Sequence, residues 1–414
     1  MTLSHQKPRI VGVTGSVGKT STKDAIFTAF SSCVRVRKSD KSFNSDVGVP
    51  LTILGLPNAW RNLYGWLKNI VRGLWPVYFQ KNYPQWLILE VGADRPGDIE
   101  RIATWVRPDV TVITLLPDVP VHIEYFKTPE EVIREKMFLA HAIVEGGMLV
   151  GNGDDAAIVD AFKKTGKQYL LYGFSEQAHV VAHEYAVRYE GVDSAKRPVG
   201  ISVCVTVEGE TYTILLDGLL GKQHVYPILA ALACTKAVGL SLQLAAAALC
   251  THIGAPGRMR LHAGMNNSTI IDDTYNASPA AVSMALSALK ELSVVGRKIV
   301  VLGDMLELGT YSVAEHQAIG REAAFADVVV TVGPRARDIA LTAGTAGVDA
   351  MHIIECADAT AAGAHVASIL KEGDVVLVKG SQGIRMEKTV AHLLADRALA
   401  PHVLVRQERE WKSR

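Results

Sequence analysis

The chain has 414 residues, of which 49% are hydrophobic, so it is long enough for two or three domains with sizeable cores. Its 43 basic and 42 acidic residues nearly cancel, which leaves no overall charge to attract nucleic acid or an acidic membrane. The 5 cysteines lack zinc-ligand spacing, and we find no signal peptide or transmembrane run, so we expect a reduced, cytoplasmic protein.

Near the N-terminus, a strand expected at residues 9–14 leads into a glycine-rich turn and a helix expected at 19–30. This is the layout of a phosphate-binding loop, in which backbone N–H groups, a lysine and a hydroxyl hold phosphates and Mg²⁺. Val13 stands where the strict motif has its first glycine. The loop predicts nucleotide binding by Thr14, Gly15, Ser16, Val17, Gly18, Lys19, Thr20 and Ser21.

Strands and helices continue to alternate after the loop. Further strands are expected at 86–91, 109–114 and 147–151, and helices at 96–105 and 129–144. Apolar strands separated by helices predict a parallel sheet covered on both faces. A β-rich flank follows, with strands at 179–189, 199–207 and 211–216 and a hairpin turn at 208–210, and then helices at 222–238 and 242–250.

A second alternation begins after the Ala-Pro-Gly-Arg run that ends at Arg258. Its strands are expected at 269–272, 298–302, 328–332 and 375–378. The predicted fold class is therefore α/β. A central P-loop ATPase-like domain, residues 1–254, precedes a Rossmann-like C-terminal domain, residues 255–414.

Three side chains of the first domain are candidates for metal chemistry. Glu90 closes an apolar strand, and carboxylates at the ends of parallel strands point into the ligand crevice. By pattern alone, His122 is an ordinary loop histidine and Lys136 a solvent-facing residue on a charged helix.

Three polar loops follow strands of the second domain. They are Ile271–Pro279, Gly303–Gly309 and Lys379–Gly383. Asp and Asn side chains in the first could bind ribose or adenine, although a capped strand–helix loop explains them equally well. Pro279 is expected in the first turn of the following helix.

In this order, the motifs resemble the Mur ligase superfamily of ATP-dependent amide-forming ligases. The resemblance covers nearly the whole chain, and the runs Asp273–Pro279 and Gly303–Gly309 look most like the MurF type. That type joins D-alanyl-D-alanine to a UDP-muramoyl tripeptide during cell-wall precursor synthesis.

The resemblance implies a role for each matching residue. Lys19, Glu90, His122, Lys136 and Arg258 would be catalytic, and a carbamylated Lys136 would hold Mg²⁺ together with Thr20, Glu90 and His122. Two Mg²⁺ ions are expected. Asn152, Arg258, Asp273 and Asn276 would contact ATP, whereas Asn44, Lys379 and Ser381 would place the substrates. A substrate carboxylate would become an acyl phosphate and then be attacked by the amine of an amino acid or dipeptide.

Two departures from the MurF type leave alternatives open. Only about ten residues precede the loop, where the family carries a UDP-binding domain, so a UDP-linked substrate is in doubt. Folylpolyglutamate or cyanophycin-like ligation and a non-catalytic nucleotide-binding module are the alternatives. We expect a monomer that takes small-molecule peptide or sugar-peptide substrates and binds no nucleic acid.

The second departure is an aromatic and basic insertion at residues 58–85. Apolar residues from Trp60 to Leu74 follow helical spacing, which predicts an amphipathic helix. One interpretation is a helix packed on the sheet or on a partner subunit. The other is a peripheral contact of residues 60–83 with a membrane or a lipid-linked acceptor.

Overall fold

The computed structural model describes residues 2–39, 43–59, 62–78, 82–116, 125–126, 128–191, 196–407 and 411. The chain divides into two compact units. The first comprises Met1–Glu184, Val203–Ile214 and Val225–His252. The second comprises Tyr185–Ser202, Leu215–His224 and Ile253–Arg414. The domain boundary expected after residue 254 stays a prediction.

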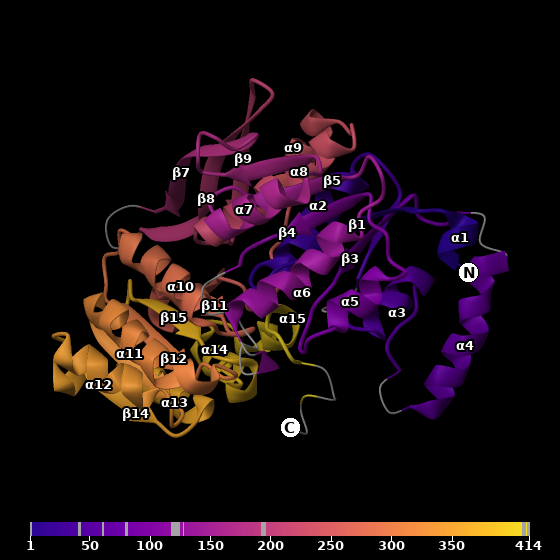
Figure 1. Cartoon of the computed structure of the whole chain (residues 1–414). Coiled ribbons are helices and arrows are strands. Elements are labelled where there is room, and N and C mark those ends of the chain that lie inside the picture. The colour runs from indigo at the N-terminus through magenta and orange to yellow at the C-terminus, as the bar shows by residue number, and fades with distance from the viewer. Residues whose placement is uncertain are drawn as a thin grey trace. The chain divides into compact units, whose positions relative to one another are not determined.

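A nine-stranded sheet, in the order β2-β3-β1-β4-β5-β6-β7-β8-β9, lies mainly in the first unit, and parts of β7, β8 and β9 belong to the second (Figure 1). Its strands are β1 (Arg9–Thr14), β2 (Val36–Lys38), β3 (Trp86–Glu90), β4 (Val110–Ile113), β5 (Met148–Asn152), β6 (Tyr169–Gly173), β7 (Val180–Glu190), β8 (Arg197–Val207) and β9 (Glu210–Asp217). From β2 to β7 in this spatial order, which includes β1, each strand is parallel to its neighbour. The turn between β8 and β9 has positive φ at Glu208 and Gly209, as a two-residue hairpin requires.

Helices of the first unit precede, connect and follow these strands along the chain. They are α1 (Thr2–Gln6), α2 (Lys19–Ser31), α3 (Gly48–Leu54), α4 (Leu63–Tyr78), α5 (Asp98–Ala103), α6 (Pro129–His141), α7 (Ala156–Thr165), α8 (Val225–Ala237) and α9 (Leu242–Leu249). Local chemistry sets several starts: the Thr128 side chain caps α6 ahead of Pro129, and Asp155 caps α7. Two buried apolar clusters, one around Leu87 and Leu89 and one around Phe162, form the core of this unit.

The second unit has a six-stranded sheet in the order β10-β11-β15-β12-β13-β14. Its strands are β10 (Arg260–Ala263), β11 (Thr269–Asp273), β12 (Lys298–Gly303), β13 (Val328–Val332), β14 (Ile353–Cys356) and β15 (Val375–Lys379). Only β10 runs antiparallel to its neighbour among the described strands of this sheet. Its α-helices are α10 (Pro279–Glu291), α11 (Ser312–Glu322), α12 (Arg337–Thr345), α13 (Ala359–Ile369), α14 (Glu387–Leu393) and α15 (Ala400–Val403).

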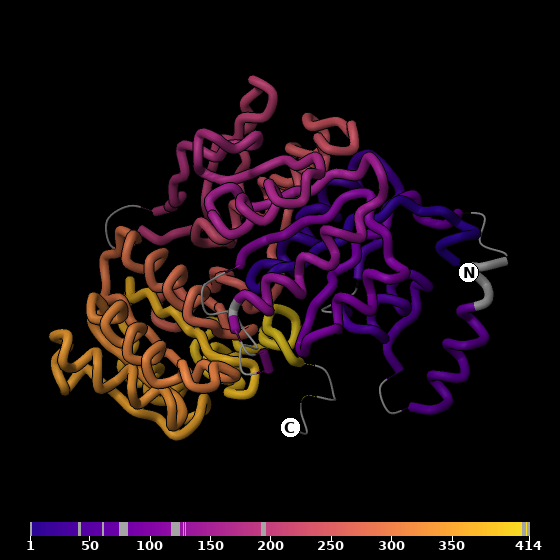
Figure 2. The backbone as a smooth tube through the Cα atoms, viewed as in Figure 1, coloured from indigo at the N-terminus to yellow at the C-terminus, as the bar shows by residue number. Residues whose placement is uncertain are grey.

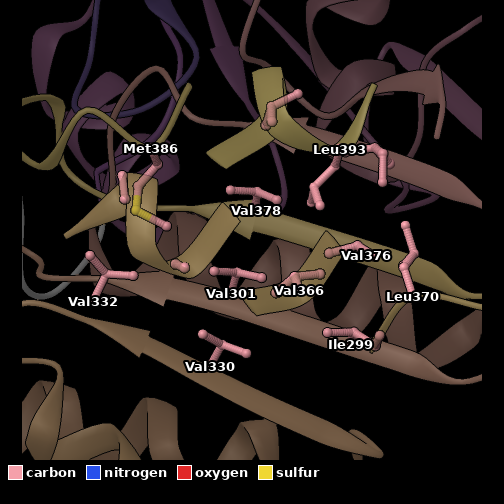
Figure 3. Packing of buried hydrophobic residues seen from close by; sticks show 14 of the residues in the cluster. Ile299, Val301, Val330, Val332, Val366, Leu370, Val376, Val378, Met386 and Leu393 are labelled. Carbon is pink, nitrogen blue, oxygen red and sulfur yellow. The ribbon is translucent and has the colours of Figure 1, made fainter. Parts of the chain in front are cut away.

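The second sheet is buried on both faces. Figure 3 shows Ile299 and Val301 of β12 packing with Val366 of α13 and Met386, just before α14. Val300 and Leu302 alternate with the two β12 residues and are equally buried, toward the other face. Apolar residues on both faces are what a parallel sheet covered by helices requires.

The predicted α/β class is therefore confirmed, and the predicted strands agree with the observed ones to within two residues. Sequence reasoning missed β2, β6, β10 and β14. These strands are three to five residues long, which is too short for a clear periodic signal.

Helix α4 confirms the predicted amphipathic helix and corrects one interpretation of it. The helix begins at Leu63, whereas Trp60 lies outside the described residues. In Figure 2 it stands at the edge of the first unit, beside the N-terminal helix α1. Its described apolar residues are largely exposed, so the apolar face does not pack on the sheet. No helix in the described part of the chain is long and apolar enough to cross a bilayer.

Candidate active site

The phosphate-type loop lies at the C-terminal end of β1, between that strand and α2. Gly15 has φ +143°, and a Cβ there would lie 2.0 Å from Thr114 Oγ1, so only glycine fits. Gly18 has φ +87° and starts α2. The end of β4 braces the loop, because Ser16 N donates to Leu115 O at 2.8 Å and Thr114 Oγ1 donates to Val17 O at 2.6 Å.

Lys19 and Thr20 open α2 beside this loop. Lys19 Nζ donates to Gly15 O at 2.8 Å and to Ser16 O at 3.2 Å, so its ammonium lies over the loop. Thr20 Oγ1 donates to Glu90 Oε1 at 3.2 Å. The strand order explains this meeting: β3 pairs with β1 in parallel, so Glu90 ends at the same edge of the sheet.

Glu90 is 1% exposed, so its carboxylate is buried and not solvated at the strand end. Its Oε1 also accepts from Asn44 Nδ2 at 3.4 Å, and its Oε2 lies 3.6 Å from Lys23 Nζ. Sequence reasoning missed Lys23, which is fully buried. The available signal was its position one helical turn after Lys19 on the same face of α2.

Lys136 on α6 is 4% exposed, so the solvent-facing position expected from pattern alone is wrong. Burial and then the nearby charge of Lys19 lower its pKa from 10.5 to about 7, against smaller opposing effects of Glu135 and Asp94. The neighbouring Glu135 caps α5, accepting from Gly97 N at 2.8 Å and Ile99 N at 2.7 Å.

The sequence predicts two other site residues of the first unit, Asn152 and His122. Asn152 ends β5 at the same edge, where its Oδ1 accepts from Asp154 N at 3.0 Å and so stabilises the following turn. His122 lies outside the described residues.

The oxygen atoms and the helix start at this edge of the sheet suit a phosphate and Mg²⁺. The Oγ atoms of Thr14 and Ser16 and Glu90 Oε2 are buried without a hydrogen-bond partner among the described residues. A hydroxyl and a carboxylate are the hard oxygen ligands that Mg²⁺ prefers, and the start of a helix favours phosphate. Buried polar atoms without partners are costly, so a ligand that engages them gains binding energy.

In the second unit, Lys379 and Asp273 form a buried ion pair with Nζ and Oδ2 2.6 Å apart. The register of two parallel strands aligns them, because Asp273 of β11 pairs with Lys379 of β15. Burial lowers the pKa of Lys379, and Asp273 opposes that shift. Lys379 Nζ also donates to Asn276 O at 3.0 Å, so the lysine holds the Asp273–Pro279 loop.

The other candidates of the second unit surround the same loop. Ser381 Oγ accepts from Leu306 N at 2.9 Å, and Asn276 Oδ1 accepts from Gln382 N at 3.3 Å. The Arg258 guanidinium lies 4.1 Å from the centre of the Tyr275 ring.

Sequence reasoning missed Arg406, which the structure places against the same loop. Its guanidinium donates to the carbonyls of Thr274, at 3.1 Å, and Tyr275, and it pairs with Glu387. No local motif marks this arginine, since its two carbonyl partners lie about 130 residues earlier in the chain.

Two family models match the chain. The Mur ligase middle domain matches residues 75–235, and the glutamate ligase domain of Mur ligases matches residues 257–382.

Curated relatives and a solved structure extend this similarity. The UDP-N-acetylmuramoyl-tripeptide–D-alanyl-D-alanine ligase of Bacillus subtilis is 27% identical over 399 residues, covering 93% of this chain and 76% of the relative. The enzyme of that name from Mycobacterium leprae is 29% identical, covering 95% and 74%. The structure of the MurF ligase of Thermotoga maritima in complex with ADP has a TM-score of 0.77 and 26% identity, covering 94% of this chain and 80% of that one.

Proposed function

The chain belongs to the Mur ligase superfamily, and we propose that it is a MurF-like, ATP-dependent ligase that forms an amide bond in cell-wall precursor synthesis. One observation of the structure carries the proposal. Lys19, Thr20 and Glu90 meet at the edge of the sheet, where buried oxygens lack hydrogen-bond partners among the described residues. The named relatives support a muramoyl tripeptide as the carboxylate substrate and D-alanyl-D-alanine as the amine.

The first step activates the carboxylate. A carboxylate oxygen attacks the γ-phosphorus of ATP, and the bond from that phosphorus to the bridging oxygen breaks, which releases ADP and leaves an acyl phosphate. Lys19 and the N–H groups around Gly18 would stabilise the phosphate charge. Thr20 and Glu90 would hold Mg²⁺, which when bound neutralises phosphate charge.

The second step forms the amide. The uncharged amine attacks the acyl carbon, the carbon–oxygen bond to phosphate breaks, and the nitrogen loses a proton. We place Arg258 and Asn276 at the nucleotide. Lys379, because it is buried and paired with Asp273, acts by positioning the Asp273–Pro279 loop. In our proposal Asn44 and Ser381 contact substrate.

Lys136 is proposed to carry a carbamate that holds a second Mg²⁺ with His122. A carbamate forms when an uncharged amine adds to carbon dioxide and loses a proton. A pKa of about 7 leaves about three quarters of the Lys136 amines uncharged at pH ~7.5, against about one in a thousand at a pKa of 10.5. The buried position and lowered pKa of Lys136 support this assignment.

An acceptor-dependent assay of ADP release tests the proposal. We expect turnover with a muramoyl tripeptide and D-alanyl-D-alanine together, and none when either is omitted. Turnover with folates and glutamate instead would contradict the MurF-like assignment. ATP binding without turnover on any acceptor would contradict ligase activity altogether.

A further inference from the structure

Helix α4 presents an apolar stripe away from the first unit. Leu63, Tyr64, Leu67, Ile70 and Val71 are 60% to 84% exposed. Their spacing places them on one side of the helix. Five large apolar side chains exposed within nine residues form a patch of the kind that marks an interaction surface.

The opposite side of the helix fixes it to the unit. Asn69 is buried and donates to Pro57 O at 2.7 Å. Gly73 packs closely, because a Cβ there would lie 3.4 Å from Leu54 and 3.5 Å from Leu56. The side that carries Asn69 and Gly73 therefore holds the helix, and the stripe from Leu63 to Val71 faces outward.

Charge indicates what the stripe contacts. Lys68 and Arg72 are exposed and flank the stripe on its polar border. The chain is nearly neutral, yet its sequence has no acidic residue between Asp46 and Glu90, where it carries Arg61, Lys68, Arg72 and Lys81. Three of its 6 tryptophans, at positions 60, 66 and 75, lie in the insertion at residues 58–85.

We propose that α4 lies in the headgroup region of an anionic bilayer and binds the protein peripherally to it. An apolar stripe bordered by basic residues suits this position, where acyl chains take the apolar side chains and anionic headgroups take the cations. A second copy fits less well, because the helix offers no acidic residue to pair with Lys68 and Arg72 of its twin. Membrane binding through α4 does not depend on the ligase reaction.

Co-sedimentation of the full chain with vesicles tests this proposal. We expect binding to vesicles of phosphatidylcholine with phosphatidylglycerol, weaker binding as salt rises, and little binding to phosphatidylcholine alone. Leu67→Glu with Ile70→Glu should weaken binding at least about a hundredfold. Lys68→Gln with Arg72→Gln should weaken it about thirtyfold, and for anionic vesicles only.

A matched control introduces two glutamates at exposed apolar positions of the second unit. Leu341 and Met351 of the second unit are 67% and 76% exposed, so Leu341→Glu with Met351→Glu should bind vesicles as the wild type does. All variants should keep the wild-type melting temperature and ADP release in lipid-free solution, which separates this inference from the proposed function.

Three results would overturn the proposal. The first is a wild-type chain that does not sediment with anionic vesicles, and the second is unchanged binding by the Leu67→Glu, Ile70→Glu variant. The third is a lipid-free dimer that this variant dissociates, since the stripe would then contact a second copy.

Discussion

Each unit buries a lysine near the edge of the sheet where its parallel strands end, Lys136 in the first unit and Lys379 in the second. The two lysines differ in their partners. Lys379 has a carboxylate oxygen 2.6 Å away and a carbonyl at 3.0 Å. Lys136 forms no ion pair within the described residues, and the charge of Lys19 disfavours its protonation. Burial lowers the pKa of both amines. Lys379, which is paired with Asp273, therefore fixes a loop, whereas Lys136 is the amine for which we propose a chemical role.

The surroundings of the two lysines differ less than their partners do. Beside the phosphate-type loop, Glu90 Oε2 and the hydroxyls of Thr14 and Ser16 lack hydrogen-bond partners among the described residues. Around Lys379, both oxygens of Asp273 are engaged, by Lys379 Nζ and by Met259 N. The second unit also buries oxygens without hydrogen-bond partners among the described residues, at Ser278 in the same loop and at Asp272. The contrast between the units therefore lies in the partners of the two lysines and of Asp273.

The largest effect is expected from Glu90→Gln. The substitution removes the negative charge that would hold Mg²⁺, so acceptor-dependent ADP release should fall about a thousandfold. Steady-state kinetics measure this, with Glu145→Gln on the exposed surface as the matched control. A loss of less than tenfold would remove Glu90 from the metal site.

Breaking the ion pair of the second unit should mainly affect stability. Asp273→Asn leaves Lys379 buried without a charged partner, so the free energy of unfolding should fall by about 3 kcal/mol. Urea unfolding measures it. Asp273→Asn with Lys379→Met should recover part of the loss, whereas a double-variant loss equal to the sum of the losses in Asp273→Asn and Lys379→Met would show that the pair is not coupled.

Lys136→Ala should lower ADP release about a hundredfold, with partial recovery in bicarbonate or short carboxylic acids that occupy the vacated space. Lys163→Ala, on the exposed side of α7, is the control. In ¹³C-bicarbonate, NMR should show a carbamate signal that Lys136→Ala removes and Lys379→Met retains. A signal that survives Lys136→Ala would place the carbamate elsewhere.

The smallest effect, taken per pH unit, is on the pH dependence of stability. The Lys136 amine has a pKa of about 7 when folded and about 10.5 when unfolded, so between these values the unfolded chain binds more protons. Stability should therefore rise with pH through this window, by at most about 1.4 kcal/mol per pH unit. Unfolding in carbon dioxide-free buffer measures it, and Lys136→Met should lack this contribution. An unchanged profile in that variant would contradict the shifted pKa.

The sequence predicted the features that depend on local order. The strand, glycine turn and helix around Lys19 were visible as one run, and Glu90 closed a recognisable apolar strand. The burial of Lys136 was not predictable from its charged helix, because burial depends on what packs over that helix. The pairing of Lys379 with Asp273 depends on the register of strands about 100 residues apart. Periodicity likewise predicted α4 but not that its apolar side faces outward.

Transfer of ¹⁸O tests the central claim most directly. A muramoyl tripeptide labelled with ¹⁸O in its reacting carboxylate is incubated with ATP, Mg²⁺ and D-alanyl-D-alanine, and mass spectrometry follows the amide and the released phosphate. The proposed reaction predicts one ¹⁸O atom in the phosphate for each amide bond formed, because the carboxylate oxygen leaves with it. Unlabelled phosphate, or ADP released without an amide product, would contradict the account.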